Sequence, residues 1–372
     1  MKIRTLIILL AMALLLAVVA AWVFLRQPAG PPPEIGQRVL RTLDINQVAR
    51  MDIASGTQRV SIVRGPDGWA VANRWNFPAR FEMVSQVLRG LDGLRVAEII
   101  HGGTELLAEF GLDEKGANEP ARIELFSDED RPLEIIALGQ PRTSPAMATA
   151  FVAPDSRYAR VGRGPVILAE PFLEDVRRRP SDWINDELLN LPAAAIHSMT
   201  ATPTNEHAYG LTRTGDGTYA GFNTLENKPI DTTAADSWFG SLQRFTFASL
   251  VDPTLSHESL GREMAEVISA RTTNGLVVRV ELGPIVPSEQ DRYAWLSFEY
   301  EGVDADAGGT AAEPTNTPAR AEFERLQKFV APWTYQVSET TWRKLLIDRE
   351  QLIAPDHSAT GSVEQASGEP VE

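Results

Sequence analysis

The stretch Arg59–Val71, with the sequence RVSIVRGPDGWAV, is the starting point for the fold of this chain. Apolar and polar residues alternate from Arg59 to Arg64, which is the period of a strand with one buried face. Gly65-Pro66-Asp67-Gly68 has the composition of a tight turn, and Trp69-Ala70-Val71 continues as a second strand. The stretch therefore predicts an antiparallel hairpin.

A helix is expected after the hairpin, and the whole pattern returns about 150 residues later. The first helix is predicted by helical spacing at Phe81, Val84, Leu88 and Leu91, and the second by Trp238, Phe239 and Leu242. Further on, Leu138-Gly139 matches Leu282-Gly283, and Ala150-Phe151 matches Ala294-Trp295 at the same spacing. This self-similarity predicts an α+β fold with two tandem repeats of mostly antiparallel sheet and a packed helix.

The N-terminal region holds the longest apolar run. Thr5–Leu25 has no charged residue, and a helix of that length spans roughly 30 Å, the thickness of a bilayer core. Lys2 and Arg4 precede it and only Arg26 follows directly, which places the N-terminus in the cytoplasm and the body in the periplasm. A cleaved signal peptide ending at Val19-Ala20-Ala21 is the alternative, but the apolar run continues through Leu25, which favours an uncleaved transmembrane helix.

The chain is accordingly divided into seven segments. They are a cytoplasmic N-terminus with the transmembrane anchor (1–26), a Pro-rich spacer (27–39), the first α+β repeat (40–185), the second repeat (186–302), a flexible insert (303–318), a C-terminal helix-strand-helix that completes the body (319–353) and a disordered acidic tail (354–372).

Composition excludes several classes of function. The 372 residues contain 35 Lys and Arg against 50 Asp and Glu, a net charge of −15, whereas a nucleic-acid or polybasic membrane-surface protein needs a basic footprint. There is no cysteine, so disulfides, thiolate metal sites and thiol nucleophiles are absent. The sequence also lacks a G-x-S-x-G elbow, a Walker A loop and a dinucleotide fingerprint, so we expect neither an enzyme nor a cofactor.

The remaining candidates for a site are few. Arg177-Arg178-Arg179 is the one basic cluster in an acidic body, and it either contacts an acidic partner or solvates the connector between the repeats. The five histidines are scattered, without the spacing of a zinc helix, so a three-histidine metal site is a minor alternative. Tryptophans could stack on sugars, but matched aromatic positions in the two repeats favour a place in the core. These are Trp69, Trp183, Trp238, Trp295, Trp333 and Trp342.

The order of the motifs resembles an uncharacterised bacterial family. It is a membrane-anchored domain-of-unknown-function family, often encoded beside ABC-transporter auxiliary subunits of the gliding-motility type. The resemblance covers about residues 40–345. Its motifs are Gly68-Trp69, Phe77-Pro78, the helix that reaches Leu91 and Leu94, Phe110-Gly111-Leu112-Asp113, Leu138-Gly139 and Trp333-Thr334-Tyr335. The second repeat departs from this pattern, because Leu260-Gly261-Arg262 stands where the first has Gly111-Leu112-Asp113.

The resemblance implies a place in the envelope and association with a transporter, but no activity and no catalytic residues. We therefore expect a non-catalytic, single-pass inner-membrane protein that binds or scaffolds other envelope or ABC-transporter subunits. Two alternatives stay open from the sequence. One is an extracytoplasmic protein that binds a glycan or small ligand between the repeats with exposed Trp, and the other is a hydrolase with a dispersed carboxylate or histidine site.

Overall fold

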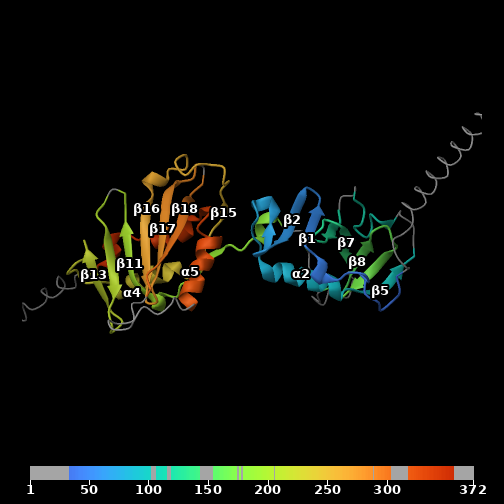
Figure 1. Ribbon diagram of the computed structural model, residues 1–372, viewed down its shortest axis with the longest axis horizontal. Helices are drawn as coiled ribbons and strands as arrows, with labels where there is room; N and C mark the ends of the chain where they lie inside the picture. The colour runs from blue at the N-terminus through green and yellow to red at the C-terminus, as the bar shows by residue number, and fades with distance from the viewer. Residues whose placement is uncertain are drawn as a thin grey trace, which may run out of the picture. The chain divides into compact units, whose positions relative to one another are not determined.

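A computed structural model describes residues 33–101, 106–114, 119–142, 154–173, 176, 179–204, 206–287, 289–302 and 317–355 (Figure 1). The chain divides into two compact units, and the division falls between Ile184 and Asn185. The expected transmembrane segment Thr5–Leu25, most of the insert 303–318 and nearly all of the tail lie outside the described residues. Within the part that is described, no helix has the length and apolar character needed to span a bilayer.

Unit 1 is built on a nine-stranded sheet in the order β4-β3-β2-β1-β6-β7-β8-β9-β5, with every neighbouring pair antiparallel. Its strands are β1 (Arg50–Ser55), β2 (Gln58–Gly65), β3 (Gly68–Val71), β4 (Phe77–Pro78), β5 (Arg95–Ile100), β6 (Ala121–Phe126), β7 (Pro132–Pro141), β8 (Arg157–Val161) and β9 (Val166–Glu170). Its helices are α2 (Phe81–Gly93) and the short 3₁₀ helices η1 (Ile45–Gln47), η2 (Ala72–Arg74) and η4 (Pro180–Trp183).

Unit 2 has an eight-stranded antiparallel sheet in the order β13-β12-β11-β16-β17-β18-β19-β15. Its strands are β11 (Ile196–Thr202), β12 (Tyr209–Arg213), β13 (Tyr219–Asn223), β15 (Ser249–Leu250), β16 (Glu266–Thr272), β17 (Leu276–Ile285), β18 (Arg292–Tyr300) and β19 (Thr334–Val337). A separate pair joins β10 (Glu187–Leu189) to β14 (Phe245–Thr246). The helices are α4 (Thr232–Phe239), α5 (Pro318–Phe329), α6 (Glu339–Leu345), η5 (Ala193–Ala195), η6 (Gly240–Leu242), η7 (Arg262–Met264) and η8 (Arg349–Leu352).

The mostly antiparallel sheets with few helices confirm the coarse prediction of an α+β fold. The hairpin predicted at Arg59–Val71 is β2 and β3, which pair from Ile62 with Val71 to Gly65 with Gly68. Gly68 has a φ of +115°, a conformation that glycine adopts without steric cost. The turn residues therefore close the hairpin where the sequence predicts it.

Helix α2 forms where the apolar spacing predicts it, and it buries Val84, Val87, Leu88 and Leu91. Phe81 does not join this face, since its side chain is 61% exposed. Phe81 is the first residue of the helix, and it precedes Val84, the first residue that the helix buries.

The strand register suggests another match than the predicted one between Ala150-Phe151 and Ala294-Trp295. Ala150-Phe151 lies outside the described residues, and the register places another alanine in this position: Leu138 pairs with Ala159 on β8, as Leu282 pairs with Ala294 on β18. A longer connection between β7 and β8 shifts the following strand along the sequence, which a fixed spacing does not show.

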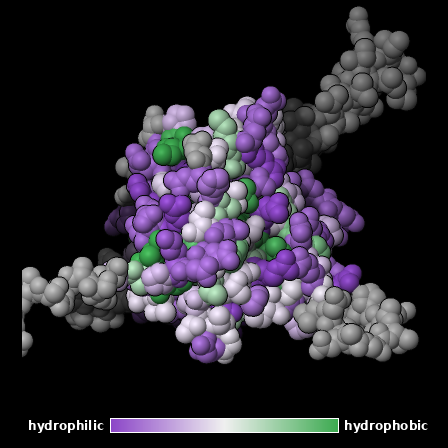
Figure 2. All heavy atoms as spheres, turned by 90° about the vertical axis from the view of Figure 1, so that its left-hand side faces the viewer, coloured by the Kyte–Doolittle hydropathy of each residue, from purple (hydrophilic) through white to green (hydrophobic). Residues whose placement is uncertain are grey.

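The core of each unit follows from alternation along its strands. In unit 1, one face of β1, β2 and β6 buries Met51, Ile53, Val60, Ile62 and Ile123, each no more than 4% exposed. The alternate residues of the same strands are mostly polar and lie on the other face, because successive side chains point to opposite sides of a sheet. On the face of the molecule seen in Figure 2, hydrophilic residues predominate and apolar residues form small separate patches.

Candidate functional site

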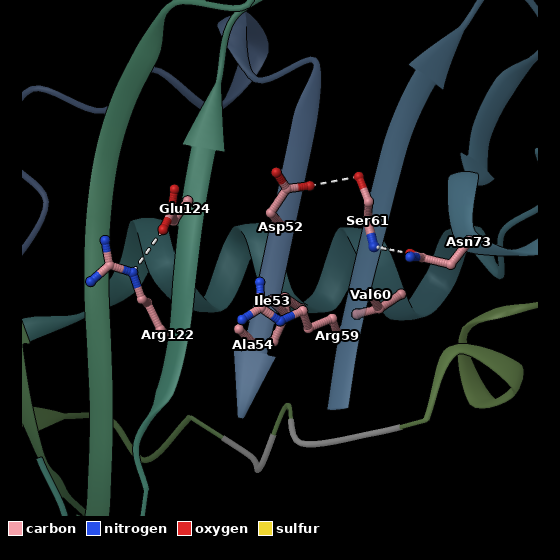
Figure 3. A pocket seen from close by; sticks show the side chains of 9 residues that line it. All are labelled: Asp52, Ile53, Ala54, Arg59, Val60, Ser61, Asn73, Arg122 and Glu124. Carbon is pink, nitrogen blue, oxygen red and sulfur yellow. Dashed lines mark hydrogen bonds and ion pairs between the residues drawn. The ribbon is translucent and has the colours of Figure 1, made fainter. Parts of the chain in front are cut away.

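A pocket of about 300 Å³ lies on the polar face of the unit 1 sheet (Figure 3). Helix α2 is behind the strands in this view, so the pocket opens on the sheet face that the helix does not cover. Side chains or backbone of β1, β2, β6 and η2 form its lining. The lining residues are Asp52, Ile53, Ala54, Arg59, Val60, Ser61, Asn73, Arg122 and Glu124.

The strand register arranges the lining residues whose side chains point to the polar face in two rows. Asp52 on β1 pairs with Ser61 on β2 and with Glu124 on β6, so these three residues form one row. Ala54 pairs with Arg59 on β2 and with Arg122 on β6, so a small residue separates two arginines in the next row. Two residues along a strand, about 7 Å, separate the rows. We call them the acid row and the arginine row.

The acid row is held by short contacts. The Ser61 hydroxyl donates to an Asp52 carboxylate oxygen at 2.6 Å, and Arg50 Nε lies 3.2 Å from the other oxygen. Arg50 also pairs with Asp130 at 2.5 Å. The Asp52 carboxylate is therefore fixed on the sheet, while its charge is only partly balanced by a shared arginine.

Arg122 joins the two rows. Its Nε donates to Glu124 at 2.7 Å and its Nη1 donates to Glu114 at 2.8 Å. The hydrogen bond from Arg122 to Glu124 is the main cause that raises the pKa of this arginine above its ordinary value. Arg122 is thus a fixed cation shared between two carboxylates.

Arg59 is the exposed cation of the pocket. The structure gives it no hydrogen bond or ion pair among the described residues. Its side chain extends from β2 toward β1 in Figure 3, next to Ala54, its neighbour in the register. Asn73 lies at the η2 end, where its side-chain oxygen accepts the backbone N–H of Ser61. Its amide NH₂ remains a donor that a ligand can use.

The pocket brings a hydroxyl, two carboxylates and two arginines together on one sheet face. Ser61 is the hydroxyl of the pocket, and its hydrogen bond goes to a carboxylate that is itself bound to an arginine. No histidine lines the pocket, so its lining holds no serine–histidine pair. Among the residues described, no three His, Asp or Glu side chains lie close enough to hold a metal ion.

The sheet of unit 2 repeats the strand order, but the row that takes the place of the acid row differs. In β11, Thr200 pairs with Gly210 on β12 and with Ser269 on β16, so this row carries no charge. A methyl group placed on Gly210 would lie 2.2 Å from the ring of Phe222 on β13. The aromatic ring therefore covers the position that corresponds to Ser61, while in unit 1 the shorter β3 ends at Val71.

The residues singled out from the sequence lie elsewhere. Arg177 and Arg178 are outside the described residues, and Arg179 precedes η4, where it pairs with Asp182 at 3.2 Å. Four histidines are exposed and lie on separate segments, and His357 is outside the described residues. The four exposed ones are His101, His197, His207 and His257.

The tryptophans mostly fill the core, which removes most of the exposed rings that sugar stacking requires. Trp183 and Trp238 are fully buried, Trp295 is 2% exposed and Trp342 is 9% exposed. The expectation of a ligand site built on exposed Trp is thus wrong for these four residues. Sequence reasoning missed the pocket because its residues alternate with core residues, as on any solvated sheet face.

A family model described as Domain of unknown function (DUF4340) matches residues 69–261, just over half of the chain. The chain belongs to this family. The DUF4340 match starts in β3 of unit 1 and ends in unit 2, so it includes Asn73, Arg122 and Glu124 of the pocket but not Asp52 or Arg59. Searches of curated proteins and of solved structures found no match.

Proposed function

We propose that this DUF4340 protein is a non-catalytic binding or scaffold protein, anchored in the inner membrane by Thr5–Leu25 with its body in the periplasm. The uncharged run and the basic residues before it support the location. The observation that carries the binding role is the unit 1 pocket, where hydrogen-bonded, charged side chains converge on one face of the sheet.

We further propose that the two units are tandem repeats. Beyond the shared strand order, a matched arginine holds a matched glycine in each. Arg157 on β8 donates to the Gly139 carbonyl at 2.6 Å, and Arg292 on β18 donates to the Gly283 carbonyl at 2.6 Å. The same contact between corresponding strands supports descent from one ancestral unit. The open pocket in unit 1 and the ring-covered position in unit 2 then suggest a division of labour, with ligand binding in unit 1 and scaffolding in unit 2.

The partner we propose is an envelope ABC-transporter complex. The support for it is the resemblance of the motifs to a family often encoded beside transporter auxiliary subunits. The chain has 50 acidic and 35 basic residues, and this negative charge favours a partner with a basic surface. Complementary charges speed the association of two proteins and disfavour other partners.

Co-purification tests the proposed function. The full chain carries a C-terminal affinity tag, is extracted in a mild detergent at low salt and is recovered with its bound proteins. We expect transporter membrane subunits to co-elute with it, and a matched tagged variant without residues 5–25 to lose them. Elution of the full chain alone under these conditions would contradict the proposal.

A further inference from the structure

The charges of the unit 1 pocket are not balanced within each row. Asp52 and Glu124 lie directly opposite each other on neighbouring strands, an arrangement that costs energy for like charges. Each has one arginine, but that arginine is shared with a second acid: Arg50 with Asp130, and Arg122 with Glu114. Four carboxylates thus share two guanidinium groups, which leaves excess negative charge on the acid row.

The opposite excess occurs at Arg59 in the arginine row. Arg122, across Ala54, is committed to Glu124 and Glu114, whereas Arg59 has no ion pair among the described residues. Ala54 is small, and the Arg59 side chain extends from β2 toward it, so the guanidinium lines the pocket without a bound carboxylate among the described residues. The pocket therefore has a negative row and a positive row, whose backbone positions are about 7 Å apart along the strands.

From this we infer that the unit 1 pocket binds a small zwitterion, with its ammonium group at Asp52 and Glu124 and its anionic group at Arg59. An ammonium group supplies three donors to the carboxylates, and a carboxylate or phosphate accepts the paired N–H groups of a guanidinium. The Ser61 hydroxyl and the Asn73 amide NH₂ both line the pocket and can hydrogen-bond the polar groups of the ligand.

A singly charged ligand fits less well. A simple anion at Arg59 would face two carboxylates across the pocket, and a simple cation at the acid row would lie near two arginines. A zwitterion avoids both repulsions, because each of its charges meets the opposite sign. The inference does not depend on a transporter partner, since it rests only on side chains of unit 1.

Two sources share this chemistry. One is a free amino acid with some separation between its charges, and the other is a phosphoethanolamine group, as in a zwitterionic lipid headgroup. The probes are therefore glycine, β-alanine, γ-aminobutyrate and O-phosphoethanolamine, with butyrate and butylamine as ligands that carry one charge only.

Equilibrium dialysis of the full chain in detergent measures the six affinities. For γ-aminobutyrate we expect a dissociation constant of about 1 mM, because the charges are largely solvated and solvent screens them. γ-Aminobutyrate should bind more tightly than glycine, whose charges are too close to reach both rows, and at least about tenfold more tightly than butyrate or butylamine. Phosphoethanolamine binding more tightly than γ-aminobutyrate would assign the headgroup, and the reverse order would assign an amino acid; either supports the inference.

Two matched variants locate the site. Arg59→Gln removes the positive end, so we expect the affinity for γ-aminobutyrate to fall at least about tenfold, to that of butylamine. Arg279→Gln makes the same change at an exposed strand position of unit 2, where the structure also gives no ion pair among the described residues, and should leave the affinity unchanged. Both variants replace exposed residues, and equal melting temperatures will show that each is folded.

Three results would overturn the inference. They are no binding of γ-aminobutyrate or phosphoethanolamine, binding of these two no tighter than that of butyrate or butylamine, and equal affinities of wild type and Arg59→Gln for γ-aminobutyrate. Failure here is distinguishable from failure of the proposed function. Co-purification with membrane subunits can persist in Arg59→Gln, and the dialysis requires no partner protein.

Discussion

Two fully buried indoles differ in their hydrogen bonds. In unit 2, Trp238 Nε1 donates to the carbonyl of Leu345 at 2.9 Å, which satisfies one of the carbonyls left open at the C-terminal end of α6. In unit 1, Trp183 Nε1 is buried and has no hydrogen-bond partner among the described residues. The N–H of Trp238 therefore contributes to stability, whereas the N–H of Trp183 loses its contact with water and gains no hydrogen bond.

This difference predicts unequal costs for the same substitution. Trp238→Phe should destabilise its unit by about 1–3 kcal/mol more than Trp183→Phe does, because it leaves the Leu345 carbonyl unsatisfied. Denaturant unfolding of both variants, monitored for each unit, measures the two changes. Equal losses in the two variants would show that the hydrogen bond of Trp238 adds nothing.

Asp216 lies in the turn between β12 and β13, where it accepts hydrogen bonds from the Thr214 and Thr218 hydroxyls and from the Thr218 backbone N–H. These contacts lower the pKa of Asp216 to about 2, with the Thr214 hydroxyl as the largest cause. Because the folded pKa lies below the unfolded one, the contribution to stability is full above about pH 4 and is lost as the pH falls toward 2.

Asp216→Asn should accordingly lower the melting temperature of unit 2 slightly at pH 7. The gap between wild type and variant should close as the pH decreases from about 4 toward 2, because wild-type Asp216 becomes protonated. Thermal melting across this pH range is the measurement. A difference in melting temperature that stays constant down to the lowest pH would mean that the charge of the Asp216 carboxylate does not stabilise the turn.

At the scale of elements, β7 and the segment Phe110–Leu112 pack with no space for a side chain. A methyl group on Gly139 would lie 2.2 Å from the backbone carbonyl oxygen of Phe110, which cannot move without shifting its segment. Gly111 has a φ of +63° there, and in unit 2 Gly261 has a φ of +72°. Both glycines thus adopt the left-handed conformation that favours glycine.

Gly139→Ala should therefore destabilise unit 1 by about 1–3 kcal/mol, the range of overpacking substitutions. Gly65→Ala on β2 is the matched control, since its methyl group would meet only Gly68 O at 3.8 Å; its effect should stay within about 0.5 kcal/mol. Chemical denaturation of the two variants tests this. A tolerated Gly139→Ala would mean that the Phe110–Leu112 segment is not fixed against β7.

Local patterns predict the elements, but not how distant elements meet. The hairpin at Arg59–Val71 and most of α2 follow from alternation and helical spacing within a few residues. The position of Ala294 shows the limit, because its register matches that of Ala159, and strand pairing depends on the length of connections. The pocket has the same origin: it requires the register of β1 against β6, about 70 residues away, which no local pattern contains.

At the scale of the whole molecule, the chain divides between Ile184 and Asn185. Ile184 forms a β-bridge with Ala79 of unit 1, whereas β10, a few residues later, pairs with β14 of unit 2. The backbone hydrogen bonds before the division therefore go to unit 1, and those after it go to unit 2. Each unit has its own sheet and its own buried residues, which is the condition for folding alone.

We expect residues 33–184 and residues 185–355, expressed separately, each to unfold in one cooperative transition. Circular dichroism during heating measures this, with the full chain for comparison. If residues 185–355 show no transition while the full chain does, the second unit depends on the first for its fold.

The central claim is that Thr5–Leu25 holds a binding body on the periplasmic side of the inner membrane. The most direct test is to fuse the C-terminus to a reporter enzyme that is active only outside the cytoplasm, and to compare the full chain with a variant that lacks residues 5–25. The account predicts strong, membrane-bound activity for the full chain and none for the variant. An inactive reporter on an expressed, full-length fusion would contradict it.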